Sequence, residues 1–155
     1  MKKDISWMQL ALEQAQAAAE LGEVPIGALV IKDGIILGRG HNRNLLDNDP
    51  TAHAEMIALR RAAAQLGNHR LVGCEMVVTI EPCVMCAGAI LHARLARLVY
   101  GASDPKAGAA GSALQVLNHP RLNHKVEVTP GVLQDRCSEI LKSFFQKRRL
   151  EQNAE

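Results

Sequence analysis

The sequence lacks any long uninterrupted apolar run, and this excludes the simplest kind of membrane protein. No stretch approaches the roughly 18 apolar residues that a membrane-spanning helix needs. The N-terminal residues also lack the apolar core of a secretory signal, because Glu13 and Gln14 interrupt the apolar residues Leu10–Leu12. We therefore expect a cytoplasmic protein without a membrane partner.

An excess of charge of one sign is also absent. The 18 Lys and Arg residues are nearly balanced by 16 Asp and Glu residues, for a net charge of +2, which neither requires nor excludes a nucleic-acid partner. Apolar residues make up 48% of the 155, so the composition is that of a chain that buries a core. No repeat, low-complexity tract or linker divides the chain, and we expect one domain over residues 1–155.

Hydrophobic periodicity and turn residues predict helices that alternate with strands. Asp33-Gly34 lies between two apolar runs, which is a strong signal for a β-hairpin. The predicted strands are 26–31, 35–37, 76–80, 95–100 and 126–128, and the predicted helices are 4–21, 52–66, 82–93, 112–117 and 134–150. This order is typical of a three-layer α/β domain, in which a mixed sheet of about five strands carries helices on both faces.

Cysteine is scarce, and two of the four cysteines form a CxxC motif at Cys83 and Cys86. In a reducing compartment, cysteines indicate metal binding or burial rather than disulfides. A redox pair is disfavoured because Pro82 precedes the two cysteines instead of separating them. At a helix start, positions i and i+3 share one face near the positive end of the helix dipole, which lowers the pKa of a thiol and suits a ligand of a cation.

His53 and Glu55 occur at the start of another predicted helix. A histidine there is often only a capping or core residue, and a glutamate often only compensates the helix dipole. Positions i and i+2 do not share a helical face, so the pair can act together only if the site lies off the helix N-terminus. Two helix starts that point at one place would bring His53, Cys83 and Cys86 together.

Three nitrogen and sulfur ligands are one fewer than a structural zinc site holds, so the set predicts one catalytic Zn²⁺ with an open position for water. Zinc lowers the pKa of such a water, and Glu55, close but not a ligand, would take its proton and deliver it to the substrate. Cys74 and Cys137 could close the site. We interpret both as core thiols, because Cys74 precedes a strand and Cys137 lies on the apolar stripe of the last helix.

His53-Ala54-Glu55 followed by Pro82-Cys83-Val84-Met85-Cys86 matches the established signature of the zinc nucleobase deaminases. Nearly the whole chain also resembles the bacterial tRNA adenosine deaminases, most clearly over residues 22–28, 49–55, 81–89 and 104–112. Ile80 stands where that family usually has Leu, a change that conserves volume.

The resemblance implies a cytidine-deaminase-like fold, a homodimer, and a tRNA anticodon stem-loop whose wobble adenosine is flipped into the pocket and converted to inosine. It also assigns contacts with the substrate. Asn42 would hold the flipped nucleoside, Val24 and Pro25 would line the pocket, and the Ala54 amide would contact the purine. Asp104 and Lys106 would shape the substrate loop. Without the resemblance, Asn42, Asp104 and Lys106 would be interpreted as turn or surface residues.

The last predicted helix has an apolar stripe, which predicts core packing: Leu133, Cys137, Ile140, Leu141 and Phe144. Phe145 flanks the stripe, and the basic residues 147–149 follow. Phe145 and residues 147–149 form either a solvated face or an RNA contact. In the RNA contact, Arg149 binds phosphate and Phe145 stacks on a base. The resemblance favours the RNA contact.

Two other functions stay open. A deaminase of a free base such as guanine or cytosine would use the same metal chemistry. A non-catalytic RNA-binding module with a structural zinc would leave Glu55 without a role and the metal one ligand short.

Overall fold

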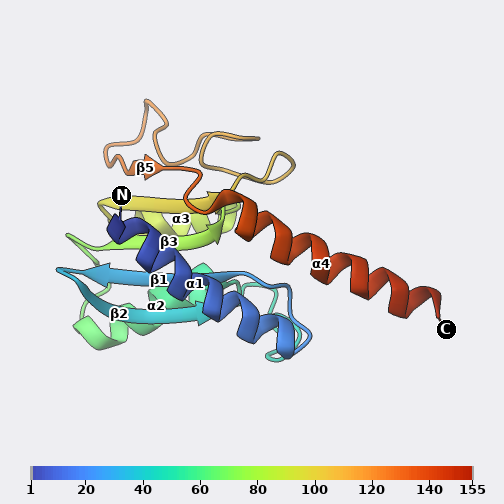
Figure 1. The fold of residues 1–155 in the computed structure, drawn as a ribbon. Helices are drawn as coiled ribbons and strands as arrows, with labels where there is room; N and C mark the ends of the chain where they lie inside the picture. The colour runs from blue at the N-terminus through green and yellow to red at the C-terminus, as the bar shows by residue number, and fades with distance from the viewer. Residues whose placement is uncertain (1, 155) are drawn as a thin grey trace.

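The computed structural model describes residues 2–154 and consists of a five-stranded sheet with helices on both faces (Figure 1). The elements in chain order are α1 (Lys2–Glu20), β1 (Gly27–Lys32), β2 (Ile35–His41), α2 (Ala54–Leu66), β3 (Glu75–Ile80), α3 (Val84–Ala93), β4 (Arg97–Ala102), β5 (Glu127–Thr129) and α4 (Gln134–Asn153). None of these helices is long and apolar enough to span a membrane.

The sheet is mixed, as the sequence predicts. Its strand order is β2-β1-β3-β4-β5, with β1 antiparallel to both β2 and β3, and with β3, β4 and β5 parallel. The hairpin turn between β1 and β2 is the predicted Asp33-Gly34 pair. Both residues are left-handed, with φ of 51° and 77°, which matches the twist of a two-residue hairpin.

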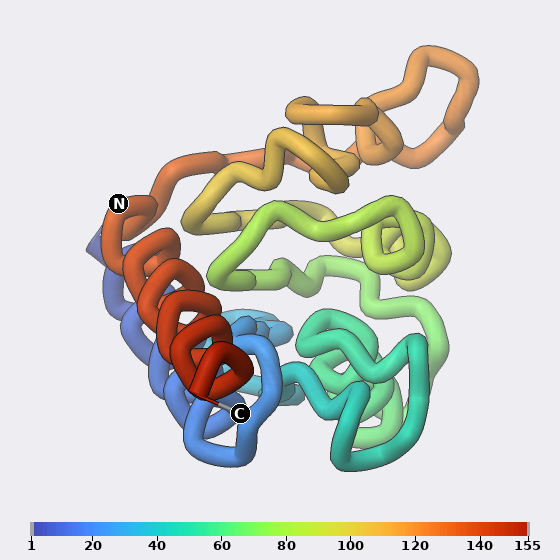
Figure 2. Tube along the Cα trace, turned by 90° about the vertical axis from the view of Figure 1, so that its right-hand side faces the viewer, coloured from blue at the N-terminus to red at the C-terminus, as the bar shows by residue number. Residues whose placement is uncertain are grey.

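Side chains of the central strands alternate between two cores. Along β1, Ala28 and Val30 pack with α2 and α3, whereas Leu29 and Ile31 pack with α1 and α4. Figures 1 and 2 show α1 and α4 side by side on one face of the sheet and α2 and α3 on the other. The predicted three-layer α/β architecture is confirmed.

The predicted helix over residues 112–117 is wrong. These residues belong to a long connection between β4 and β5, in which an isolated bridge joins Ala110 and Gln115. The physical reason is local. Gly111 has a φ of 129°, outside the helical region, and the amides of Ala110 and Ser112 donate to the carboxylate of Glu81 instead of to helical carbonyls.

Helix α4 packs on the sheet only through its first turns. Cys137 is fully buried and Ile140 is partly buried against the α1 face, but Leu141 and Phe144 are only half-buried. Figure 1 shows that the C-terminal half of α4 extends beyond the ends of the strands. The expected core packing of the apolar stripe is therefore correct for the beginning of the helix and wrong for its end.

Candidate active site

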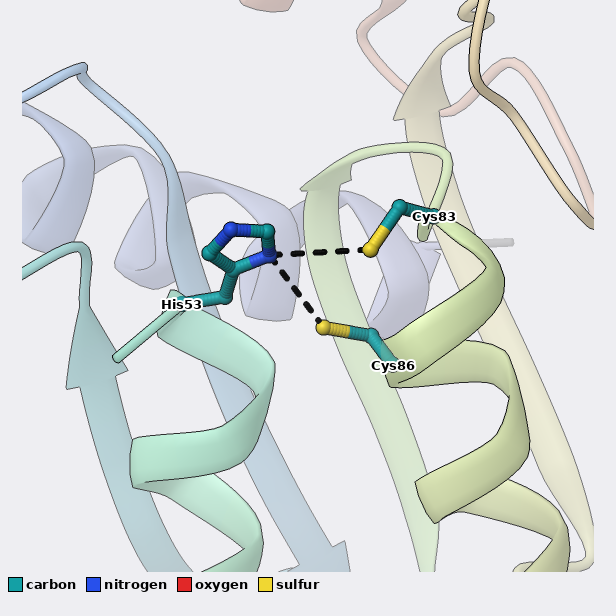
Figure 3. A group of neighbouring side chains, drawn as sticks. All are labelled: His53, Cys83 and Cys86. Carbon is teal, nitrogen blue, oxygen red and sulfur yellow. Dashed lines mark hydrogen bonds between the residues drawn. The ribbon is translucent and has the colours of Figure 1, made fainter. Parts of the chain in front are cut away.

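Two helix N-termini meet at the candidate site (Figure 3). His53 is the N-cap of α2 and Cys83 is the N-cap of α3, and both have extended backbones, with ψ of 155° and 177°. The sequence prediction placed His53 and Pro82 inside the first helical turns, so it started these helices two residues early. Neither N-cap side chain makes a capping hydrogen bond to its own helix, and each points toward the other helix.

The three predicted metal ligands converge. His53 Nδ1 lies 3.6 Å from Cys83 Sγ and 3.5 Å from Cys86 Sγ, and the three ligand atoms are all within 4.8 Å of one another. Ligands about 2.05 Å (nitrogen) and about 2.3 Å (sulfur) from a tetrahedral zinc lie about 3.6 Å apart. The spacing of these side chains therefore fits a zinc ion.

The electrostatics of the cluster also favour a cation. The Cys86 thiol and the His53 ring hold the pKa of Cys83 at about 3, so this thiolate forms readily. The bond to Cys83 and burial raise the pKa of Cys86, because a second thiolate would lie beside the first. A divalent cation between the two sulfurs would remove this repulsion, and metal binding would release the second proton.

Glu55 follows His53 by two residues in α2 and is only 3% exposed. Burial raises the pKa of its carboxyl group. Among residues 2–154, the group whose ligand atoms lie close enough to hold a metal ion is His53, Cys83 and Cys86, and Glu55 is outside it. Cys74 and Cys137 are both fully buried and outside this group, which confirms that they are core thiols.

The start of α2 is held by the end of β2. Asn42 is buried, and its Oδ1 accepts a hydrogen bond of 2.8 Å from the Ala54 amide. Gly40 allows the close approach of helix and strand, since a Cβ at this position would lie 2.5 Å from the Ala54 carbonyl oxygen. Two of the expected substrate contacts, Asn42 and Ala54, are therefore bonded to each other.

A buried glutamate also anchors the segment before β1. Glu23 is 2% exposed, and its carboxylate accepts the amides of Leu45 at 3.1 Å and Leu46 at 2.8 Å. The expected pocket residues follow directly, with Val24 half-buried and Pro25 buried. Sequence reasoning missed Glu23, whose bonding partners are backbone groups more than twenty positions away.

The loop of residues 104–112 lies against the turn that leads into α3. The Ala109 amide donates to the Pro82 carbonyl oxygen at 2.9 Å. Within the loop, Asp104 Oδ1 accepts the amides of Lys106 and Ala107, each at 3.1 Å, and the Lys106 side chain is exposed. Sequence reasoning also missed Glu81, whose carboxylate accepts hydrogen bonds from the amides of this loop.

The basic cluster at the end of α4 divides into two parts. Arg148 donates to the Gly22 carbonyl oxygen at 2.9 Å, and its guanidinium carbon lies 4.6 Å from the centre of the Phe144 ring. Arg148 therefore attaches α4 to the segment that precedes Val24. Phe145 is 41% exposed and Arg149 is exposed, so these two side chains can meet a partner.

Comparison with known proteins places this geometry in a family. The MafB19-like deaminase family matches residues 2–149. A tRNA-specific adenosine deaminase of Haemophilus influenzae is 51% identical over 153 residues, which cover 98% of this chain and 88% of the relative. The chain belongs to the tRNA-specific adenosine deaminase family. Another family member, from Agrobacterium fabrum, is 44% identical over 151 residues, covering 97% of this chain and 99% of its own.

Two solved structures are also similar to this chain. A structure from work on A-to-I editing by tRNA:A34 deaminases at the wobble position of transfer RNA is similar at a TM-score of 0.85 and 46% identity. That match covers 88% of this chain and 99% of that chain. A guanine deaminase of Nitrosomonas europaea is similar at a TM-score of 0.79 and 27% identity, covering 90% of this chain and 83% of that chain.

Proposed function

We propose that this deaminase hydrolyses adenosine to inosine at the wobble position of a tRNA anticodon and releases ammonia. The observation that carries the proposal is the convergence of His53, Cys83 and Cys86 beside a buried Glu55. The substrate class is supported by the relatives, since proteins with 44% and 51% identity over nearly the whole chain are tRNA-specific adenosine deaminases.

The proposed cofactor is one zinc ion per chain, held by His53 Nδ1 and the sulfurs of Cys83 and Cys86. When bound, zinc activates water for attack on the purine. The ligand types and their spacing support zinc, and three protein ligands leave one tetrahedral position open. A structural zinc is disfavoured because residues 2–154 offer no fourth ligand at this place.

Glu55 is the proposed proton carrier. Water adds its oxygen to C6 of the purine, and the bond from C6 to the amino nitrogen breaks, so that the products are inosine and ammonia. Glu55 takes one proton from the water and delivers it to the ring nitrogen, and then carries the second proton, from the added hydroxyl, to the leaving amino group. Its buried position supports this role, because burial raises the pKa of the carboxyl group above its ordinary value, as is common for carboxyl groups that act as general acids and bases.

We propose substrate contacts at two places beside the metal cluster. Asn42 Oδ1 is bonded to Ala54, and no acceptor among residues 2–154 engages the Nδ2 group, which is left for the flipped nucleoside. The Ala54 amide would contact the purine by sharing its proton between the two acceptors. Val24 and Pro25 would form the pocket wall. The remaining proposed contacts with RNA are Asp104, Lys106, Phe145 and Arg149.

We further propose a cytoplasmic homodimer that meets the anticodon stem-loop with a single catalytic domain over residues 1–155. A groove between α2 and α3 supports the homodimer, because most of its lining is apolar, with three polar residues beside it. The apolar residues are Met56, Leu59, Ala63, Leu71, Ala89 and Ala93, and the polar ones are Arg60, His69 and His92. Attachment of both terminal helices to the same face of one sheet supports the single domain.

The test is incubation of the zinc-loaded protein with an adenosine-containing anticodon stem-loop, followed by nucleoside analysis for inosine. The matched control is Glu55→Gln, which we expect to keep the zinc and the fold but to lose about 10²–10⁴-fold in turnover, because an amide cannot take a proton from water. Absence of inosine with the zinc-loaded wild type contradicts the proposed function.

The second candidate is a deaminase of a free base, favoured by the similarity to the guanine deaminase. A free base forgoes contacts with flanking nucleotides, and these contacts support the rate as well as the affinity. We therefore expect little activity on free adenosine, cytidine or guanine at the concentration used for the stem-loop. Comparable or faster turnover of a free base would overturn the RNA substrate and leave the deaminase chemistry intact.

A further inference from the structure

Glu81 is a buried carboxylate that the proposed chemistry does not use. It follows β3, precedes Cys83 by two residues and is 2% exposed. Its Oε1 accepts the Asp104 amide at 3.1 Å and the Ser112 hydroxyl, and its Oε2 accepts the amides of Ala110 at 3.0 Å and Ser112 at 3.1 Å. All of these donors come from one loop, residues 104–112.

The loop closes tightly over this carboxylate. A Cβ at Gly108 would lie 2.5 Å from Glu81 Oε2 and 2.5 Å from the Asp104 carbonyl oxygen, so glycine is needed for the close approach. The next residue, Ala109, donates its amide to Pro82. The loop is thus attached at two consecutive residues, Glu81 and Pro82, immediately before the ligand Cys83.

The chemistry of the contact requires an ionised carboxylate. Two carboxylate oxygens offer about four lone-pair sites, and Glu81 receives four donors from the loop. Hydrogen bonds to a charged acceptor are roughly twice as strong as neutral ones. Glutamine has the same length but only one acceptor oxygen, and in either orientation its NH2 group would face at least one of these N–H groups.

The bonds continue from Glu81 to the residues expected to meet RNA. Glu81 holds the Asp104 amide, and Asp104 Oδ1 in turn holds the amides of Lys106 and Ala107. We propose that Glu81 is a positioning residue that fixes the 104–112 loop beside the metal-binding turn and thereby sets the affinity for the RNA substrate. This inference rests on the proposed function, in which Asp104 and Lys106 contact the substrate.

The first experiment compares steady-state kinetics of zinc-loaded wild type and Glu81→Gln on the anticodon stem-loop. We expect KM to rise about tenfold, as for the loss of one hydrogen bond to a charged group, and kcat to stay within about twofold. Zinc content should be unchanged. The matched control is Glu75→Gln at the opposite end of β3, where the carboxylate pairs with Arg97 and KM should not change.

The second experiment measures amide hydrogen exchange without substrate. In Glu81→Gln, the amides of Asp104, Ala110 and Ser112 should lose protection, while the amides of α2 keep theirs. The two failures are distinguishable. If the zinc-loaded wild type forms no inosine, the proposed function fails. If these three amides stay protected in Glu81→Gln, the role of Glu81 is overturned. A raised KM together with lost protection supports the inference.

Two other outcomes overturn the inference. One is an unchanged KM in spite of faster exchange. The other is a loss of zinc with a fall in kcat, which would make Glu81 a support of the metal site alone.

If Glu81→Gln does not fold, Ser112→Ala carries the test, because it removes only the hydroxyl contact. We expect Ser112→Ala to raise KM about tenfold, as for the loss of one hydrogen bond to a charged group, and an unchanged KM would overturn the inference.

Discussion

Asn42 Oδ1 accepts a buried hydrogen bond of 2.8 Å from the amide of Ala54. Asn42 directly follows β2, and Ala54 is the first residue of α2, so this bond fixes the helix start against the strand end. Ala54 is flanked by His53, a proposed zinc ligand, and Glu55, the proposed proton carrier. The bond therefore positions both groups, and the other end of the Asn42 amide is the proposed contact with the nucleoside.

Two substitutions of Asn42 separate these roles. Asn42→Ala leaves the Ala54 amide without its acceptor, and we expect it to lower the free energy of unfolding by about 1–3 kcal/mol. Asn42→Asp keeps an acceptor at a helix N-terminus but removes the Nδ2 donor. We expect it to keep most of the stability and to lose about tenfold or more in kcat/KM on the stem-loop. Urea unfolding and kinetics measure the two effects, and full activity of Asn42→Asp contradicts the nucleoside contact.

The metal assignment predicts which cysteines hold zinc. Cys83→Ala and Cys86→Ala should each lose most of the bound zinc, because two remaining ligands form a much weaker site. Elemental analysis of the purified proteins measures this loss. Cys74→Ala is the matched control, since Cys74 is a fully buried thiol outside the cluster and its replacement should leave about one zinc per chain. Undiminished zinc in a folded Cys83→Ala protein would contradict the assignment.

The sequence predicts the elements that depend on local pattern. Asp33-Gly34 specifies its hairpin because both positions need a left-handed backbone, and the apolar runs of β1, β3 and β4 are buried as expected. The convergence of the proposed ligands also follows from the sequence, because His53 and Cys83 lie at predicted helix starts. The predicted starts of α2 and α3, at residues 52 and 82, are each two residues earlier than in the structure.

The sequence does not predict contacts made by single polar side chains with distant backbone groups. Glu23 and Glu81 look like ordinary surface glutamates, yet their acceptors are filled by amides 22 to 31 positions away. Such partners leave no periodic pattern. A glutamate placed directly after a buried strand, as Glu81 is, was the available signal. The bonds to Glu81 also explain why the predicted helix at 112–117 does not form.

The two arginines at the end of α4 should behave differently. Arg149 is exposed, and if it meets phosphate, Arg149→Ala should reduce the slope of log K against log salt by about 0.7–0.9 and leave kcat on saturating RNA unchanged. Arg148 is bonded to Gly22, so Arg148→Ala should instead release α4 from the segment before β1. Binding titrations at several salt concentrations measure the slope. An unchanged slope in Arg149→Ala would mean that Arg149 is only solvated.

The ion pair between Asp4 and Arg97 should make stability depend on acid pH. The pair joins α1 to β4 through bonds of 2.7 and 3.0 Å, and both side chains are largely shielded from water. The hydrogen bonds from Arg97 hold the pKa of Asp4 below its ordinary value of 3.8. The contribution of this pair is therefore fully present above about pH 4 and is lost as the pH falls through the lowered pKa.

Asp4→Asn tests this dependence, because it removes the charge and keeps the size of the side chain. At pH 7 we expect the variant to unfold with a free energy about 1–3 kcal/mol lower than the wild type. The difference should shrink as the pH falls below the ordinary pKa of 3.8, since the wild-type carboxylate is then protonated as well. The control is Asp47→Asn, which removes an exposed carboxylate paired with the partly buried Arg43, and urea unfolding from pH 7 to pH 3 measures both. If the difference in unfolding free energy between wild type and Asp4→Asn does not change with pH, the charge of Asp4 does not contribute to the attachment of α1 to the sheet.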